Sequence, residues 1–214
     1  TEPLTLTTIK GVSCIVIRTR QYFETASVAR VVSWFDFDIK LFRHCRHIAP
    51  DVVVISSLSL TSVVFGVYLK ARHGSRLVFE VRDIWPLTMI EEGGFSRWHP
   101  LALYLRWIEI LGYRRADLIV GTMPNLKKHV LETGVRKPDH AFHTCGIGVL
   151  PERKEAQPYF RFNEKIEDML SKRTAVGYCG SIGLSNNLHD FVTYIDECVR
   201  DDVIFIIAGD GADR

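Results

Sequence analysis

Short runs of β-branched residues alternate with stretches of helix length, and this alternation limits the fold more than any other feature of the sequence. The runs predict strands at Val12 to Ile17, Val52 to Ile55, Leu77 to Val81 and Leu118 to Val120. The intervening stretches predict helices at Ala26 to His47, Thr61 to Arg72, Pro100 to Arg115 and Pro124 to Glu132. Repeated strand–helix–strand units imply right-handed crossovers and a parallel sheet. The sequence therefore predicts an α/β domain.

A second unit of the same kind is expected towards the C-terminus. Prolines and mixed charges interrupt the apolar periodicity over residues 150–173, which is the predicted linker. A strand, a helix and a strand are expected after it, at Ala175 to Cys179, Asn187 to Val199 and Val203 to Ala208. Two strands and one helix cannot bury their apolar faces alone. We therefore predict two Rossmann-like parallel-sheet domains, one over residues 1–149 and an incomplete second one over 174–214.

Composition bounds the partners and the compartment. The 27 basic and 25 acidic residues leave a net charge of +2, so nucleic acid is not an expected partner. Five scattered cysteines without a CxxC pair are typical of a reducing compartment, which predicts a cytoplasmic protein. The uncharged run from Val52 to Leu69 is about long enough to span a bilayer. Its serines and threonine favour a buried strand, a polar loop and a helix instead.

The first candidate for chemistry is Arg82-Asp83, directly after the predicted strand Leu77 to Val81. In an open parallel sheet the carboxyl ends of the strands line the ligand crevice. A carboxylate there could orient or deprotonate a hydroxyl, and the arginine could bind phosphate or keep the carboxylate ionised. A structural ion pair between the two is the alternative. The acidic loop at Glu91-Glu92 either contacts a substrate or is simply solvated.

Two glycine-rich turns follow the later predicted strands. They are Gly177-Tyr178-Cys179-Gly180-Ser181-Ile182-Gly183, ahead of the helix expected near Asn187, and Gly209-Asp210-Gly211. Glycines let backbone N–H groups approach a diphosphate, and the positive end of the next helix adds attraction. The spacing is not the GxGxxG fingerprint. Packing could explain the first turn, and a tight turn could explain the second.

Other patterns are less specific. The pairs His44/His47 with Cys45 and His140/His143 with Cys145 resemble fragments of a metal site, but each lacks a carboxylate third ligand. We assign them structural or surface roles and expect no metal and no cofactor. The segments Trp98 to Arg115 and Val31 to Arg46 are basic and aromatic. Such faces suit an anionic membrane surface, or equally a core covered by snorkelling arginines.

Taken together, the motifs resemble those of bacterial family 4 glycosyltransferases over most of residues 50–214. The matching segments are Pro50-Asp51-Val52-Val53-Val54, Phe79-Glu80-Val81-Arg82-Asp83-Ile84-Trp85-Pro86, Tyr113-Arg114-Arg115-Ala116-Asp117, the Gly177 to Gly183 loop and Ala208-Gly209-Asp210-Gly211. The resemblance implies a GT-B fold with an N-terminal acceptor domain and a C-terminal nucleotide-sugar domain. It also implies metal-independent transfer with retention of configuration. The subgroup with Arg-Asp-Ile/Leu-Trp-Pro is similar to enzymes that build O-antigen (lipopolysaccharide) or capsule on lipid-linked acceptors at the inner face of the membrane.

The resemblance also implies roles for single residues. It suggests catalytic, acceptor-proximal positions for Asp83 and Arg82, with Glu91, Glu92 and Thr122 on the acceptor side. The residues expected around the donor of a hexose or amino sugar are Gly180, Ser181, Gly183, Asn187, Gly209, Asp210 and Gly211. Leu184-Ser185-Asn186-Asn187 departs from the lysine of many relatives, and Thr144 to Gly148 departs from their Pro-Asn-Gly.

The family's N-terminal strand with its glycine loop and its two-glutamate motif are not in this sequence, so we expect a chain truncated at both ends. A sugar-nucleotide 2-epimerase of the same fold and a non-catalytic membrane-associated scaffold remain the alternatives.

Overall fold

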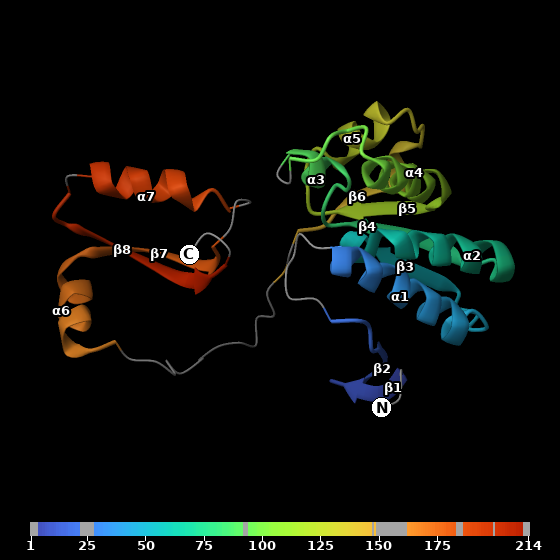
Figure 1. Cartoon of the computed structure of the whole chain (residues 1–214), viewed down its shortest axis with the longest axis horizontal. Helices are drawn as coiled ribbons and strands as arrows, with labels where there is room; N and C mark the ends of the chain where they lie inside the picture. Colours follow the sequence, from blue (N-terminus) through green and yellow to red (C-terminus); the bar gives the residue numbers. More distant parts are fainter. Residues whose placement is uncertain are drawn as a thin grey trace. The chain divides into compact units, whose positions relative to one another are not determined.

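A computed structural model describes residues 4–21, 28–91, 94–146, 148, 162–182, 186–198 and 200–211. The chain divides into two compact units, Thr1–Gly148 and Val149–Arg214 (Figure 1). Two of the predicted site residues, Glu92 and Gly183, lie outside the described residues. The first half of the predicted linker, residues 150–161, lies outside them as well.

The first unit is built on a parallel sheet with the strand order β3-β4-β5-β6. Its strands are β3 (Val52–Ser56), β4 (Arg76–Val81), β5 (Leu118–Gly121) and β6 (Phe142–Thr144). The helices that connect them are α2 (Val63–His73), α3 (Leu87–Glu91), α4 (Pro100–Arg115) and α5 (Leu126–Glu132), with the short turns η1 (Ser57–Ser62) and η2 (Asp139–Ala141). The predicted parallel α/β layer is confirmed, and the run from Val52 to Leu69 forms a strand, a helical turn and a helix.

Glycines close two of these helices. Gly74 has φ 74° and ψ 15°, and its backbone N–H donates to the Lys70 carbonyl at the end of α2. Gly134 follows α5 with φ 85°. A left-handed residue at a helix end is least strained when it has no Cβ. The two glycines therefore mark where each helix turns back towards the sheet.

The prediction that Val12 to Ile17 joins the parallel sheet is wrong. This segment is β2 (Val12–Ile17), which pairs antiparallel with β1 (Leu4–Ile9) in a separate sheet. The turn between them explains the difference, because Lys10 and Gly11 have φ of 50° and 80°. Positive φ at both central residues is the geometry of a two-residue hairpin turn. The hairpin precedes α1 (Val28–Cys45) in the chain.

The core of the first unit lies between the sheet and the helices α2 and α4. Leu77, Phe79 and Val81 alternate along β4 and are each about 1% exposed. They form one cluster with residues of both helices. A Cβ on Gly112 of α4 would lie 2.8 Å from the Phe79 ring, so this glycine lets the helix pack closely on the sheet. The opposite face is exposed at β3, where Val54 is 61% exposed, whereas Val78 of β4 and Val120 of β5 on that face are half-buried.

Two polar side chains join elements within this unit. Asp117 accepts hydrogen bonds from Lys70 Nζ of α2 (2.5 Å) and from the Leu77 backbone of β4 (2.8 Å). Burial raises the pKa of Asp117, but these hydrogen bonds outweigh it and hold the pKa below its usual value. Buried Glu109 accepts from the Tyr113 hydroxyl at 3.0 Å and lies 2.9 Å from His129 Nε2 of α5. The buried carboxylate is therefore paired, as burial requires.

The second unit contains α6 (Glu164–Lys172), β7 (Thr174–Ser181), α7 (Leu188–Glu197) and β8 (Val203–Asp210). The two strands are parallel and in register over their whole length. Phe191 of α7 packs edge-on against Phe205 of β8, with ring centroids 5.9 Å apart. None of the described side chains in this unit is fully buried. The order strand, helix, strand agrees with the sequence prediction.

Candidate functional site

The carboxyl ends of neighbouring strands meet at one edge of the first sheet. Val81 of β4 lies opposite Gly121 of β5, and Gly121 lies opposite Thr144 of β6. The residues after these strands line a pocket of about 260 Å³. Its lining consists of Glu80, Arg82, Val120, Gly121, Thr122, Cys145 and Gly146. The structure therefore brings together two of the predicted residues, Arg82 and Thr122.

The backbone after β4 is held by a side chain from the neighbouring strand end. Ser57 Oγ accepts hydrogen bonds from the Arg82 N–H (2.9 Å) and from the Asp83 N–H (3.1 Å). Ser57 is itself 1% exposed, whereas Arg82 and Asp83 are exposed. Within the described part of the chain neither Arg82 nor Asp83 forms an ion pair. The alternative of a structural ion pair is therefore wrong, and both side chains face solvent.

The remaining acceptor-side predictions fare differently. Asp83 adjoins the pocket through the chain but is not one of its lining residues. Glu91 ends α3, is exposed and does not line the pocket. The sequence reasoning missed Ser57 and Cys145, although each directly follows a strand, β3 and β6 respectively. The strand-end rule that selected Arg82 would have selected both.

Gly121 shapes the floor of this pocket. A Cβ on Gly121 would lie 2.9 Å from the Val81 carbonyl oxygen and would overlap the Leu126 side chain. The backbone carbonyl belongs to a strand and cannot move without breaking the sheet. A glycine is therefore needed at the end of β5, where the chain passes close to β4 and then enters α5.

The second unit brings its predicted residues to the carboxyl ends of β7 and β8. Gly180 pairs with Gly209, and Ser181 pairs with Asp210. Next to them, the Gly211 N–H donates to Asp210 Oδ1 at 2.9 Å. Four of the predicted donor residues thus lie side by side on two strands, and the fifth follows directly.

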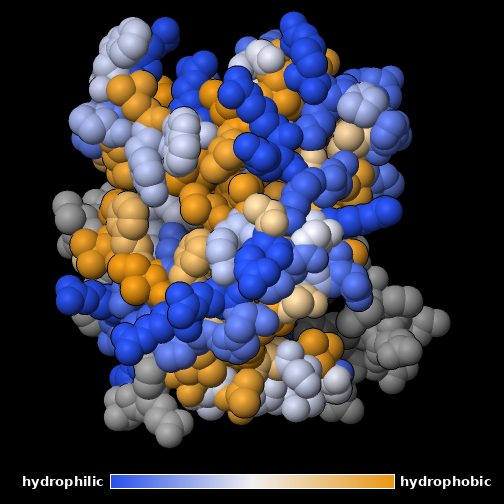
Figure 2. Space-filling model, turned by 90° about the vertical axis from the view of Figure 1, so that its right-hand side faces the viewer, coloured by the Kyte–Doolittle hydropathy of each residue, from blue (hydrophilic) through white to orange (hydrophobic). Residues whose placement is uncertain are grey.

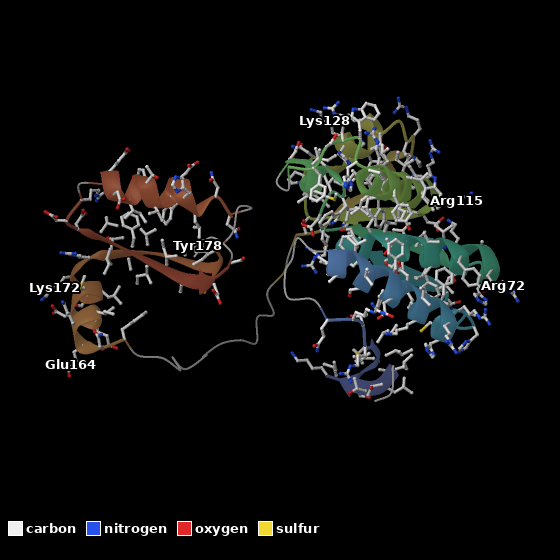
Figure 3. All side chains as sticks on the ribbon, in the orientation of Figure 1. Arg72, Arg115, Lys128, Glu164, Lys172 and Tyr178 are labelled. Carbon is white, nitrogen blue, oxygen red and sulfur yellow. The ribbon has the colours of Figure 1, made fainter. Side chains whose placement is uncertain are left out.

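Side chains fix the loop that leaves β7. The Tyr178 hydroxyl and the Asn186 Nδ2 each donate to the Ser181 carbonyl oxygen at 2.7 Å. Asn187 precedes α7 with φ 47°, and its Nδ2 donates to Asp190 Oδ2 at 2.7 Å. In Figure 3 the Tyr178 side chain lies among those between the strands and α7. The Ser181 carbonyl oxygen therefore already accepts two hydrogen bonds from within the protein.

Close packing explains two of the glycines in this unit. A Cβ on Gly209 would overlap the Gly180 carbonyl oxygen, and one on Gly211 would overlap the Ile182 carbonyl oxygen. Close packing, which is the alternative predicted for the first turn, is thus found in the second segment, where Gly209 and Asp210 end β8 instead of forming a separate turn. It does not exclude ligand binding, because a backbone without side chains is also what a diphosphate can approach.

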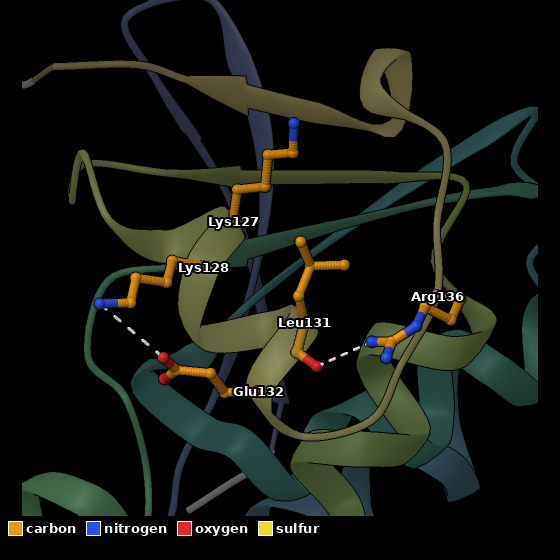
Figure 4. A pocket seen from close by; sticks show the side chains of 5 residues that line it. All are labelled: Lys127, Lys128, Leu131, Glu132 and Arg136. Carbon is orange, nitrogen blue, oxygen red and sulfur yellow. Dashed lines mark hydrogen bonds and ion pairs between the residues drawn. The ribbon is translucent and has the colours of Figure 1, made fainter.

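A second hollow lies on α5 and has a different character. Its lining consists of Lys127, Lys128, Leu131, Glu132 and Arg136 (Figure 4). Lys128 lies 3.9 Å from Glu132, and Arg136 donates to the Leu131 carbonyl at 3.0 Å. These cations are already engaged on an open surface, so the pocket at the strand ends is the better candidate site.

No group of three or more His, Cys, Asp or Glu side chains in the described ranges could hold a metal ion. The helices that the structure describes include none long and apolar enough to cross a membrane.

Comparisons with known proteins agree on the type of domain. A family model described as "Glycosyl transferase 4-like domain" matches residues 9–146. The crystal structure of HepE from Anabaena in complex with UDP matches with a TM-score of 0.55 and 14% sequence identity. The match covers 85% of this chain and 46% of HepE, so this chain spans about half the length of that protein. At this identity the match shows the fold, which is α/β and GT-B-like. No curated protein sequence matches.

Proposed function

This chain belongs to the glycosyl transferase 4-like domain family, and on that premise we propose that it is part of a nucleotide-sugar-dependent glycosyltransferase. The observation that carries the proposal is the placement of the motifs at strand ends. Arg82 and Thr122 line one pocket in the first unit. Gly180, Ser181, Gly209 and Asp210 lie in register in the second. In parallel α/β sheets, strand ends of this kind bind ligands.

We assign the acceptor to the first unit and the donor to the second. The donor is a nucleotide diphosphate sugar carrying a hexose or an amino sugar. The carboxyl ends of β7 and β8, at Gly180, Ser181, Gly209, Asp210 and Gly211, would receive its diphosphate, and Gly183 and Asn187 are assigned to the same donor. HepE was crystallised with UDP, which supports a nucleotide ligand for this fold. The acceptor is a saccharide, with Arg82 and Asp83 beside the reacting hydroxyl and transfer without a metal and with retention.

The test is a calorimetric titration of the protein at its full native length. UDP-, GDP- and ADP-linked sugars and the free nucleotides are titrated in turn. We expect binding of at least one nucleotide sugar in the micromolar to millimolar range typical of enzyme substrates. Absence of heat for every nucleotide and every sugar conjugate would remove the proposal. Product analysis then separates transfer to an acceptor from epimerisation of the donor, and absence of both products with a bound donor would leave a scaffold.

The exposed residues of α4, and those just before it, suit an acceptor that is held at a membrane. Trp98, two residues before α4, and Trp107, in the middle of α4, are 75% and 58% exposed. Every exposed charge on this helix is positive, from Arg106, Arg114 and Arg115, and its one acidic residue is buried. Figure 2 shows hydrophobic residues exposed between hydrophilic ones on the face that it draws, without distinguishing α4. Exposed aromatics with arginines are typical of proteins that bind anionic bilayers.

We therefore propose a lipid-linked acceptor at the cytoplasmic face of the membrane, as in O-antigen or capsule synthesis. Sedimentation with phosphatidylcholine vesicles containing about one third phosphatidylglycerol measures the contact. We expect the protein to sediment with these vesicles and Trp107→Ser to sediment less. Equal sedimentation with pure phosphatidylcholine would contradict the electrostatic part, and no sedimentation with either would contradict the contact.

A further inference from the structure

Two adjacent serines end β3 and begin η1, and they behave differently. Ser57 Oγ accepts two backbone hydrogen bonds, from Arg82 at 2.9 Å and Asp83 at 3.1 Å. The Ser56 hydroxyl is also buried but has no hydrogen-bond partner in the described part of the structure. The chain thus supplies its own comparison between a serine that holds the segment after β4 and one that does not.

The two hydrogen bonds span 25 and 26 residues and fix successive peptide units. The β3–β4 ladder has no pairs beyond Glu80, which lies opposite Ser56. At Arg82 and Asp83 the backbone N–H groups therefore rely on Ser57 instead of on a strand. Because two consecutive N–H vectors converge on one oxygen atom, the directions of both side chains are set together.

Burial makes this arrangement rigid. Ser57 is 1% exposed, and its neighbours in η1 include the buried residues Leu60 and Thr61. Water competes little for a buried acceptor, so the hydrogen bonds to Ser57 Oγ persist. Removing it leaves two N–H groups with no acceptor in a partly buried turn, which such groups avoid by moving towards water.

We propose that Ser57 is a positioning residue for Arg82 and Asp83. It acts through the backbone and touches no substrate itself. This inference rests on the proposed function, in which those two side chains face the acceptor. Ser57 holds the Arg82 side chain over the pocket that Thr122 and Gly146 also line. A shift of about 1 Å in such a group can cost about 100-fold in rate.

The experiment compares Ser57→Ala with Ser56→Ala in the protein at its full native length. Amide hydrogen exchange is measured at Arg82 and Asp83, and transfer is measured at saturating donor. We expect Ser57→Ala to speed exchange at both amides by about tenfold or more, and to lower kcat by about 10- to 100-fold with donor affinity unchanged. Ser56→Ala is expected to match the wild type in both. Equal exchange and equal kcat in the two variants would overturn the inference.

Two additions keep the outcomes distinct. If Ser57→Ala does not fold, Ser57→Cys, which keeps the size and a weaker acceptor, is compared with Ser56→Cys under the same criteria. Asp83→Ala serves as the reference for the site. Normal transfer by Asp83→Ala means that the proposed role of Asp83 fails, while the exchange data still decide whether Ser57 orders the segment. Loss of transfer by Asp83→Ala with normal kcat in Ser57→Ala means that the positioning role fails alone.

Discussion

Asp38 of α1 is a carboxyl group in surroundings that disfavour its charged form. It projects from α1 towards η1 and α4, and its Oδ1 is buried without a hydrogen-bond partner in the described part of the structure. Burial raises the pKa of Asp38 to about 6, against a smaller opposing effect of a hydrogen bond from Thr61. Burial and the Asp38 charge together raise the pKa of Tyr104. At neutral pH the fold therefore contains a carboxylate that it stabilises poorly.

This predicts a stability that depends on pH in a definite direction. Because the folded state holds the Asp38 proton more tightly than the unfolded chain, the free energy of unfolding falls as pH rises from about 4 through about 6. Asp38→Asn is expected to remove this fall and to stabilise the protein at pH 8 by on the order of 1 kcal/mol. Denaturant unfolding at pH 4.5, 6 and 8 measures it.

Asp36 on the same helix is the matched control. Its carboxylate binds Lys40 Nζ at 2.7 Å, and this hydrogen bond lowers the pKa of Asp36. A lowered pKa contributes stability above the unfolded value that is lost as pH falls, so Asp36→Asn should cost stability at pH 8 and little near pH 3. The same pH trend in both variants would contradict the assignment of the effect to Asp38.

At the scale of elements, contacts between backbones decide which strands pair closely. Gly209 of β8 lies against the Gly180 carbonyl of β7, and any Cβ there would overlap it. A Cβ on Gly177, four residues before Ser181 in β7, would meet nothing within 4 Å. The two glycines occupy the same strand pair but differ in the space around them.

Gly209→Ala is therefore expected to destabilise the second unit. The strands would have to separate, at a cost of about 1–3 kcal/mol. Gly177→Ala should be neutral or stabilise slightly, because alanine loses less conformational entropy in a strand. Hydrogen exchange of the β7 and β8 amides compares the two, and equal protection in both variants would show that the strands tolerate a Cβ at position 209.

The elements differ in how far sequence could predict them. The range predicted from the sequence, Pro100 to Arg115, has the same bounds as α4, which a proline begins and the extended residue Ala116 ends. The hairpin was missed because the β-branched run Val12 to Ile17 has the same composition in either kind of sheet. Its pairing depends on the Lys10-Gly11 turn, which the alternation of strands and helices does not reveal.

The site was predicted in part for a similar reason. Motif positions at the carboxyl ends of strands, such as Arg82 after β4 and Gly209 in β8, follow from the order of elements alone. The role of Ser57 could not be read in this way, because it depends on contacts 25 and 26 residues away along the chain. Nor does the order of elements show which glycines touch a neighbouring backbone.

At the scale of the whole molecule, the first unit has a sheet whose two faces are unlike. Residues of β4 on one face lie under α2 and α4, whereas Val52 and Val54 of β3 on the other face are 52% and 61% exposed. Parallel sheets usually carry helices on both faces. In addition, β3 is the edge strand of the described sheet, and edge strands offer unpaired N–H and C=O groups.

The exposed valines of β3 affect how residues 1–214 behave in solution. Produced as a separate protein, this chain should self-associate through the valines of β3, and light scattering should rise with its concentration. Val54→Thr, which keeps the branched shape, should reduce the scattering. Val53→Thr, which alters the helix-covered face, should lower the melting temperature instead without improving solubility. The solubility of this chain thus depends on the face of β3 that does not pack in the core.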